Sequence, residues 1–586
     1  MNTFSAVPAS VDPVSSPPPI WIRRFDPPLQ QDGGPQPGAP LKGLRFAIKD
    51  NIDVAGQPTT AACPAYTRVA TESATVVHKL LQAGALLVGK TNLDPFACGL
   101  SGARSPFGEV PNAFNPAMVS GGSSSGSAYA VATGAVDFAL GTDTAGSGRV
   151  PAGLNNIVGF KPTRGRISAH GVVPAVQSAD AVSVLARTVP MAWRVLQSAA
   201  GFDPLDPFSR GHGDVAWRTR PYPAAPQVGI PRELEFFGDD LAREAFDQAT
   251  QRLVRMGARL VLIDYQPLAE AAELLYGSAL VAERYLAIRE FFDGHELDIV
   301  EPVRSIIGAS RRFSANDVLA AQLQLRRLAA RIRPMWDGID FMMVPTTPTH
   351  ITREAMRLDP VGLNRRLGHY TNFVNLLDYA ALSVPSAIRP DGLPFGVTFI
   401  GQAGSDWCLA DWGTRYHSLA ETEGLLPLGA TRERMQQADR CPPPPPGPLL
   451  TGADEIALAV VGAHLTGMPL NHQLTDRGAR LLRTTLTAPV YRLYALQASA
   501  QARPGLVRVP DGQGAGIEVE IWAMPVEQLG SLVAAVPAPL SIGRLALADG
   551  GEVSGFLCEA HAVEAAQDIT HAGGWRAHLA ATACRT

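Results

Sequence analysis

Two serines set among glycines are the clearest candidates for chemistry in this chain. Ser123 lies in a run of glycines and serines at residues 121–127, and Ser147 follows 24 positions later (147 − 123), directly between Gly146 and Gly148. Glycine lets a backbone approach a ligand closely. A serine in such a turn can supply both a hydroxyl nucleophile and backbone N–H donors. The pattern therefore indicates nucleophilic catalysis, with Ser147 as the nucleophile.

A serine nucleophile needs a base to remove its proton, and no histidine lies near either glycine-rich run. Lys49, far upstream in a strand-like segment at residues 45–49, is the alternative base, with Ser123 as a proton relay between Lys49 and Ser147. An ordinary lysine has a pKa of ~10.4, and neutralising it at pH 7 costs roughly 4–5 kcal/mol. We therefore expect burial to lower the pKa of Lys49.

The turn before Ser147 also supplies candidate oxyanion donors. The N–H groups of Thr144, Ala145 and Gly146, with that of Ser147, could converge on a developing negative charge. Taken alone, the glycine-rich runs could instead bind phosphate or form tight turns, and Lys49 could be a surface charge or a salt-bridge partner. A P-loop is excluded because no Gly-Lys-Ser/Thr follows, and a Gly-x-Ser-x-Gly elbow is excluded because glycines flank the serine directly.

The three segments together, in this order and spacing, resemble the amidase signature family over roughly residues 40–440. In that family the residues matching Lys49, Ser123 and Ser147 act as base, relay and nucleophile, and the relay serine follows a cis peptide bond. The resemblance implies amide hydrolysis with no metal and no cofactor. Residues 159–165 match a further family segment, in which Lys161 is interpreted as structural.

Two further segments, at residues 141–152 and 276–285, look like the allophanate hydrolase branch of that family. There a tyrosine and an arginine eight positions apart bind the substrate carboxylate, and Tyr276 and Arg284 have that spacing (284 − 276). We expect both on one face of one helix, about two turns apart. From spacing alone, a solvated helix face is the alternative. The match also implies that the backbone at Gly99 lines the pocket.

The order of elements predicts an α/β fold, with a mixed β-sheet flanked by helices. Strands and helices alternate between residues 45 and 140, and residues 240–335 carry long amphipathic stretches that favour a helical layer. Four parts are predicted along the chain. They are a proline-rich, loosely docked lead-in at residues 1–40, the amidase-signature domain at 41–440, a polyproline linker at 441–448 and a small α+β domain at 449–586.

The last domain resembles the C-terminal domain of allophanate hydrolases and, more distantly, the gamma-glutamylcyclotransferase-like fold. A glycine-rich turn follows a hydrophobic strand at residues 461–472. In that branch the domain is linked to the loss of carbon dioxide from N-carboxycarbamate. His464 is the candidate catalytic residue and His472 a weaker one. The alternative is a structural domain for dimerisation, with His464 as a core histidine.

Composition excludes some classes of function. The chain has 586 residues and a net charge of −4, which gives no sign of a nucleic-acid or membrane partner. Its six cysteines show no metal-ligand spacing, and at this density we expect no disulfide framework. The N-terminus lacks the basic and apolar regions of a secretory signal. We expect a cytoplasmic homodimer.

The resulting hypothesis is hydrolysis of allophanate to ammonia and N-carboxycarbamate, followed by decarboxylation. Two alternatives stay open. One is an amidase that acts on another small amide, malonamide-like or aryl. The other is an amidotransferase-type subunit that passes ammonia to a partner protein.

Overall fold

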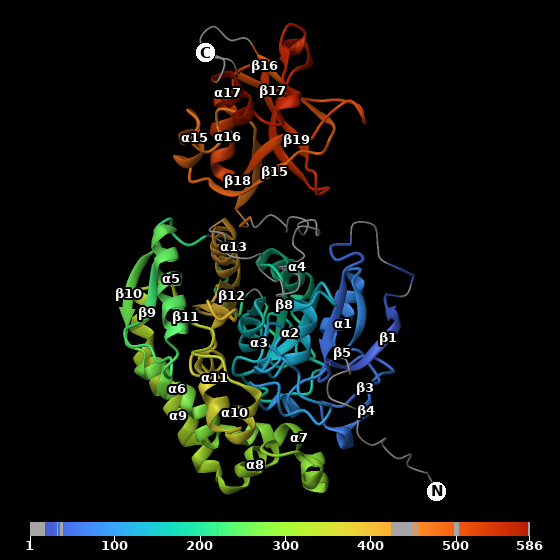
Figure 1. Cartoon of the computed structure of the whole chain (residues 1–586), viewed down its shortest axis with the longest axis vertical. Helices are drawn as coiled ribbons and strands as arrows, with labels where there is room; N and C mark the ends of the chain where they lie inside the picture. The colour runs from blue at the N-terminus through green and yellow to red at the C-terminus, as the bar shows by residue number, and fades with distance from the viewer. Residues whose placement is uncertain are drawn as a thin grey trace. The chain divides into compact units, whose positions relative to one another are not determined.

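The computed structural model divides the chain into two compact units. One comprises Met1–Arg218 and Tyr222–Cys441, and the other comprises Thr219–Pro221 and Pro442–Thr586 (Figure 1). The structure describes residues 18–31, 33–34, 39–211, 213–218, 221–422, 451–452, 454–496 and 503–583. The predicted polyproline linker at 441–448 lies outside these residues. Among them, no helix is both long enough and apolar enough to cross a membrane.

A mixed sheet forms the centre of the first unit. In sheet order, the eleven strands found among the described residues are β1 (Trp21–Leu29), β5 (Leu86–Thr91), β2 (Arg45–Lys49), β6 (Phe138–Asp143), β8 (Ala181–Ala186), β7 (Val158–Lys161), β12 (Ala380–Ile388), β13 (Pro394–Gly401), β11 (Phe341–Pro345), β9 (Gln227–Pro231) and β10 (Arg259–Ile263). β1 and β10 are its two edges (Figure 1). Pairing is parallel in β5-β2-β6 and β11-β9-β10, and antiparallel from β6 to β11. The predicted α/β class with a mixed sheet is confirmed.

The helices of this unit pack against the sheet or against one another. They are α1 (Thr75–Gln82), α2 (Ser125–Ala132), α3 (Val150–Leu154), α4 (Val189–Ala199), α5 (Asp240–Arg255), α6 (Gln266–Gly277), α7 (Ala282–His295), α8 (Val303–Gly308), α9 (Ala315–Ile332), α10 (Arg353–Leu358), α11 (Gly362–Leu367), α12 (Asn372–Leu376) and α13 (Asp406–Thr422). A short hairpin, β3 (Pro58–Thr59) with β4 (Arg68–Val69), lies outside the main sheet.

The proline-rich lead-in is not loosely docked over its whole length. β1 pairs antiparallel with β5, with Trp21 opposite Thr91, and so extends the sheet. Pro27 and Pro28 lie within β1, and the register shifts between Arg24 and Leu29. Proline cannot donate to a strand ladder, but an edge strand tolerates it because one side of the strand is unpaired. The proline-rich composition therefore gave the wrong prediction for residues 21–29, which form an ordered edge strand.

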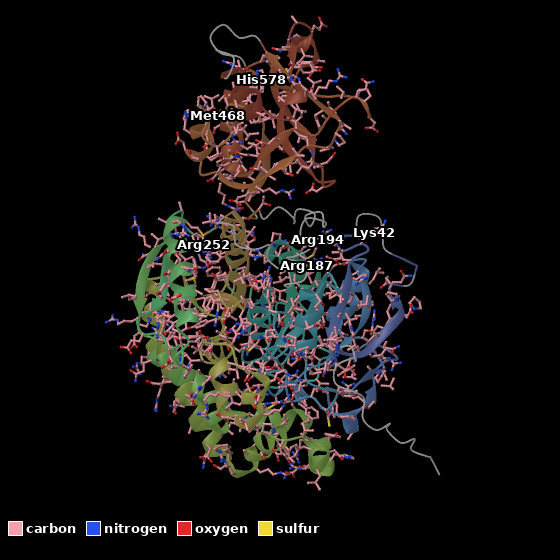
Figure 2. The ribbon with its side chains drawn as sticks, in the orientation of Figure 1. Lys42, Arg187, Arg194, Arg252, Met468 and His578 are labelled. Atoms are coloured by element: carbon pink, nitrogen blue, oxygen red, sulfur yellow. The ribbon has the colours of Figure 1, made fainter. Side chains whose placement is uncertain are left out.

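The predicted helical layer at residues 240–335 contains a strand. α5 to α9 account for most of it, but β10 lies between α5 and α6 and pairs in parallel with β9. α5 packs against β12 and β13 and carries Arg252, which Figure 2 labels. Arg252 donates to Tyr416 Oη on α13 at 2.8 Å and to the Ser386 carbonyl on β12 at 3.1 Å.

Small residues allow the loop that carries Ser123 to sit close to the sheet. α2 begins two residues after Ser123, and most of its small side chains are buried against β6 and β2. A Cβ atom at Gly126 would lie 2.7 Å from the backbone nitrogen of Asn92, so only glycine fits there. The start of α2 is thereby fixed near the ends of β2 and β5.

The second unit has a five-stranded and a three-stranded sheet among its described residues. The first has the order β15 (Arg480–Leu486), β18 (Glu518–Pro525), β14 (Glu455–Val460), β20 (Glu552–Cys558) and β19 (Leu540–Ala546), and the second has β17 (Arg503–Arg508), β16 (Tyr491–Leu496) and β21 (Gln567–Asp568). Its helices are α15 (His472–Thr475), α16 (Val526–Ala535) and α17 (Trp575–Ala583). A buried core that includes Leu458, Trp522 and Leu532 joins these elements. The gamma-glutamylcyclotransferase-like assignment stays a prediction.

Candidate active site

Lys49 ends strand β2, and its ammonium group is held by two hydroxyls. Nζ donates to Ser123 Oγ at 2.7 Å and to Thr142 Oγ1 at 2.7 Å. The residue is 0% exposed. The parallel register of β2 and β6 pairs Ile48 with Leu140, which brings Thr142 alongside the end of β2. No carboxylate of the described residues lies within salt-bridge distance of this lysine, so the hydroxyls are its direct partners.

Burial sets the protonation of Lys49. Desolvation lowers its pKa to about 7, while Asp94, Asp180 and Asp143 oppose the shift and the charge of Arg284 adds to it. A lysine with this pKa is partly neutral near pH 7, and can therefore accept a proton there. This is the shift that the choice of lysine as the base requires.

The loop of Ser123 is packed against the loop of Ser147. The peptide bond between Gly122 and Ser123 is cis. The Ser124 N–H donates to the Ser147 carbonyl at 3.3 Å, and both serines of the proposed pair are buried. The structure thus brings Lys49, Ser123 and the turn of Ser147 together, although they come from separate segments. Their roles as base, relay and nucleophile are taken up below as a proposal.

A buried ion pair shapes the turn that leads to Ser147. Arg149 Nη2 and Nε donate to the two Asp143 carboxylate oxygens, each at 2.9 Å. The same carboxylate accepts the N–H of Gly146 at 2.9 Å and that of Gly148 at 3.1 Å. The expectation that Gly146 donates to an oxyanion is therefore corrected, because Asp143 already occupies its N–H.

The other predicted oxyanion donors remain available. Within the part of the chain that the structure describes, the N–H groups of Thr144, Ala145 and Ser147 have no hydrogen-bond acceptor. The Ala145 carbonyl accepts from Thr371 Oγ1 at 2.6 Å, which fixes the orientation of the turn. These three N–H groups are the candidate oxyanion donors that the structure leaves.

Tyr276 and Arg284 meet, but not on one helix. Tyr276 lies at the end of α6 and Arg284 on α7, because the chain leaves the helical conformation at Ser278 (φ −126°, ψ 179°). The Ser278 hydroxyl then accepts the N–H of Leu280 at 3.2 Å and starts the next helical segment. The single-helix expectation was wrong. Even so, Arg284 Nη2 donates to Tyr276 Oη at 3.2 Å.

Arg284 is a buried cation, and part of its guanidinium has no hydrogen-bond partner among the described residues. It is 3% exposed, and its Nε and Nη1 atoms have no hydrogen-bond partner among the described residues. Burial raises the pKa of Tyr276, so its phenol stays protonated and can donate. A buried guanidinium with unpaired N–H groups is costly unless an anion completes it. The pair therefore offers a guanidinium and a hydroxyl to a carboxylate.

Gly99 lies next to the Ser123 loop. Its Cβ, if present, would be 2.5 Å from Asp94 Oδ2, and the carbonyl of Leu100 accepts the Gly122 N–H at 2.7 Å. Asp94 is one of the carboxylates whose charge acts on Lys49. The position is consistent with tight packing beside the site. Its role in lining a substrate pocket stays a prediction.

In the second unit, His464 lines a cavity of about 290 Å³. Its Nε2 lies 3.1 Å from Gln473 Oε1, its ring stacks on Phe556 at 4.9 Å, and burial lowers its pKa. A largely neutral imidazole therefore faces the cavity at neutral pH. His472 is more exposed, with Nδ1 2.9 Å from the Pro469 carbonyl.

The described residues contain no group of three or more His, Cys, Asp or Glu side chains that could hold a metal ion. The hydroxyls, the lysine and the guanidinium described above can transfer a proton or bind an anion. Their arrangement suits proton transfer and the binding of a small anion.

Comparison with known proteins assigns both units. The amidase family model matches residues 30–409, which is more than half of the chain. The chain belongs to the amidase family. A second family model, described as the allophanate hydrolase C-terminal domain, matches residues 456–580.

Individual relatives agree with these matches. A urea amidolyase of Saccharomyces cerevisiae is 42% identical over 548 residues, covering 92% of this chain and 30% of the yeast protein. The structure of selenomethionine-substituted allophanate hydrolase from Kluyveromyces lactis is 39% identical, with a TM-score of 0.70 over 97% of this chain and 95% of that one. One subunit of the glutamyl-tRNA(Gln) amidotransferase of Chlamydia trachomatis is 31% identical, over 66% of this chain and 84% of its own length. This chain spans only about 30% of the length of the urea amidolyase.

Three residues of the site escaped the sequence analysis. Thr142 holds Lys49, Asp143 braces the turn of Ser147, and Asp180 accepts a hydrogen bond from Thr144 Oγ1 at 2.5 Å. Thr142 and Asp143 lie within the run at residues 141–152, but only the pairing of β2 with β6 shows what Thr142 contacts. For Asp180 the sequence offers no signal, since the contact joins residues 36 positions apart.

We predict that the rate of amide hydrolysis rises with pH through about 7. The pKa of Lys49 is lowered to about 7, and only the neutral amine can accept the serine proton. Below that pH the rate should fall about tenfold per pH unit. The measurement is a profile of kcat/KM against pH with ammonia as the readout. A rate that keeps rising toward pH 10 would show that Lys49 titrates as an ordinary lysine.

We also predict that Lys49→Met stabilises the first unit in a pH-dependent way. In the unfolded chain the lysine titrates near 10.5, whereas in the folded chain its pKa is about 7. The wild type therefore loses stability as the pH falls from 10.5 toward 7, by up to about 5 kcal/mol, and no further below 7. The difference in Tm between variant and wild type should grow over that window and then level off. Lys42→Met, at an exposed lysine (Figure 2), is the matched control and should show no such trend.

Proposed function

We propose that this chain hydrolyses allophanate, with Lys49, Ser123 and Ser147 as the base, relay and nucleophile. The buried Arg284, which has two unpaired N–H-bearing nitrogens among the described residues and lies beside the Tyr276 hydroxyl, carries the proposal. Allophanate is a small anion with a carboxylate next to a urea-like amide. A guanidinium can grip that carboxylate with two hydrogen bonds, and the phenol can add a third. The similarity to allophanate hydrolase and urea amidolyase supports this substrate.

The contacts around Lys49 suggest the order of proton transfers. Neutral Lys49 takes a proton from Ser123, which takes one from Ser147 as the Ser147 oxygen attacks the urea-like carbonyl. The N–H groups of Thr144, Ala145 and Ser147 stabilise the resulting oxyanion. The proton then returns to the departing nitrogen, and ammonia leaves an acyl-serine. Water hydrolyses this ester and releases N-carboxycarbamate.

The second unit is proposed to assist the next step, in which N-carboxycarbamate loses carbon dioxide. His464 and Gln473 line its cavity, and the match to the allophanate hydrolase C-terminal domain supports the link. The net products are ammonia and carbon dioxide. The cytoplasmic setting and the homodimer predicted from the sequence are kept as part of this proposal.

The amidotransferase alternative has support of its own. Several relatives are subunits of glutamyl-tRNA(Gln) amidotransferases, which match the first unit at 31–36% identity. Ammonia release from allophanate by the purified chain, without a partner protein, would disfavour the amidotransferase alternative. Release from malonamide, with allophanate inert, would favour an amidase of another specificity.

We predict that Arg284→Met lowers kcat/KM for allophanate by about a hundredfold or more. The substitution leaves the substrate carboxylate without its buried partner, which typically costs about 2–5 kcal/mol. Activity on a neutral amide such as malonamide, measured on the alkaline plateau of the pH profile, should fall little, because that substrate makes no ion pair. The comparison is made on the plateau because Arg284 also lowers the pKa of Lys49. The assay is ammonia release from both substrates by the purified chain.

Arg289→Met is the matched control, because Arg289 lies on the same helix α7 and is exposed, with a side-chain exposure of 64%. It should leave both activities unchanged. Equal losses on both substrates in the Arg284 variant would contradict the role of Arg284 in carboxylate binding.

We predict that His464→Ala slows the release of carbon dioxide and leaves the first release of ammonia unchanged, since His464 belongs to the second unit. The measurement is a rapid time course of both products from labelled allophanate, with His561→Ala, at an exposed histidine of the same unit, as the control. Unchanged carbon dioxide kinetics in His464→Ala would favour a structural role for this domain.

A further inference from the structure

Asp180 is a half-buried carboxylate that lines a cavity and contacts the turn that leads to Ser147. Its Oδ1 accepts the Thr144 hydroxyl at 2.5 Å, and its Oδ2 accepts the Ala175 N–H at 2.8 Å, with the Val176 N–H at 3.2 Å from both oxygens. Thr144 lies three residues before Ser147. Asp180 therefore ties the turn of the nucleophile to the loop at residues 174–180.

The same loop is anchored on the helix that carries Arg284. The Glu283 carboxylate accepts the Ser178 N–H at 3.0 Å and the Ser178 hydroxyl at 2.6 Å. Glu283 directly precedes Arg284 on α7. Two hydrogen-bonded links therefore hold this loop: Ser178 is tied to Glu283, the neighbour of Arg284 in the sequence, and Asp180 is tied to Thr144 in the nucleophile turn.

We propose that Asp180 is a positioning residue for the amide hydrolysis. Its hydrogen bonds fix the Thr144–Ser147 turn relative to Arg284, and its carboxylate lines the same cavity as Thr142, which accepts a hydrogen bond from Lys49. The inference rests on the proposed function, because it takes Ser147 as the nucleophile and Lys49 as the base.

Its place among the charges supports this role. Asp180 acts electrostatically on both Lys49 and Arg284, yet no salt bridge joins it to either one within the described residues. Its oxygens are instead taken by Thr144 and by backbone N–H groups. Arg284 is therefore left free for a ligand, while part of its charge is balanced.

The groups that face Lys49 come from several elements. Asp94, Asp143 and Asp180 raise the pKa of Lys49, and Arg284 lowers it. Burial raises the pKa of Asp180 itself, whereas the backbone donors and Arg284 favour its ionised form. Replacing the Asp180 carboxylate by an amide removes one of the three negative charges, so the pKa of Lys49 should fall further.

The test uses the whole chain and a neutral fluorophosphonate that phosphonylates a nucleophilic serine. The rate of labelling is measured against pH for the wild type, Asp180→Asn, Thr144→Val and Asp206→Asn. This reagent carries no carboxylate, so the readout does not depend on allophanate as the substrate.

In Asp180→Asn we expect the acidic limb of the profile to move down by roughly one pH unit and the plateau rate to fall at least about tenfold. In Thr144→Val the plateau rate should fall while the acidic limb stays at its wild-type pH, because the variant loses the hydrogen bond to Asp180 but keeps the Asp180 carboxylate. Asp206→Asn is the matched control. Asp206 is a buried carboxylate that lines the same cavity of about 160 Å³ as Asp180, but among the described residues it accepts only backbone N–H groups. Its profile should match the wild type.

The possible failures are distinguishable. Labelling of Ser147→Ala at the wild-type rate would overturn the proposed function itself. If Ser147→Ala is not labelled, but Asp180→Asn keeps both the wild-type limb and the wild-type plateau, only the inference about Asp180 is overturned. A lower plateau with an unmoved limb in Asp180→Asn would overturn the electrostatic part, and circular dichroism would show whether that variant folds.

Discussion

The desolvation of Lys49 is the constraint on which the candidate active site depends. A lysine pKa lowered from 10.5 to about 7 corresponds to about 5 kcal/mol of unfavourable free energy for the charged form. The fold therefore excludes water from the end of β2 and offers two hydroxyls, from Ser123 and Thr142, in place of a carboxylate. A direct salt bridge would keep the amine charged and remove it as a base.

The carboxylates that act on Lys49 have other hydrogen-bond partners, so within the described residues none of them forms a salt bridge with this base. Asp143 is taken by Arg149 and by two backbone N–H groups, and Asp180 by Thr144 and the loop at residues 174–180. Each carboxylate uses its oxygens to fix a loop while its charge still acts on Lys49. The same two carboxylates therefore influence the pKa of Lys49 and fix the geometry of the loops. A buried pair of this kind is a poor source of stability but a good means of fixing geometry.

Arg284, the candidate anion-binding residue, differs from these carboxylates because its hydrogen-bonding capacity is only partly used. Arg284 is buried, donates to Tyr276 and keeps two nitrogens unpaired among the described residues. A folded protein tolerates such a group where a ligand completes it. The break at Ser278 turns the chain between the two residues and lets their side chains meet across separate helices.

The sequence by itself determined the α/β class, the strand at residues 45–49, and the candidates Lys49, Ser123, Ser147, Tyr276 and Arg284, because glycine placement, hydrophobic periodicity and a family resemblance are local properties. The tertiary structure decided which of these groups touch. The register of β2 with β6 places Thr142 beside Lys49, and the Asp143 carboxylate accepts the Gly146 N–H. Despite its prolines, β1 pairs with β5 and forms one edge of the sheet. Asp180 could not be found from the sequence, since long-range contacts and burial arise only when distant segments pack together.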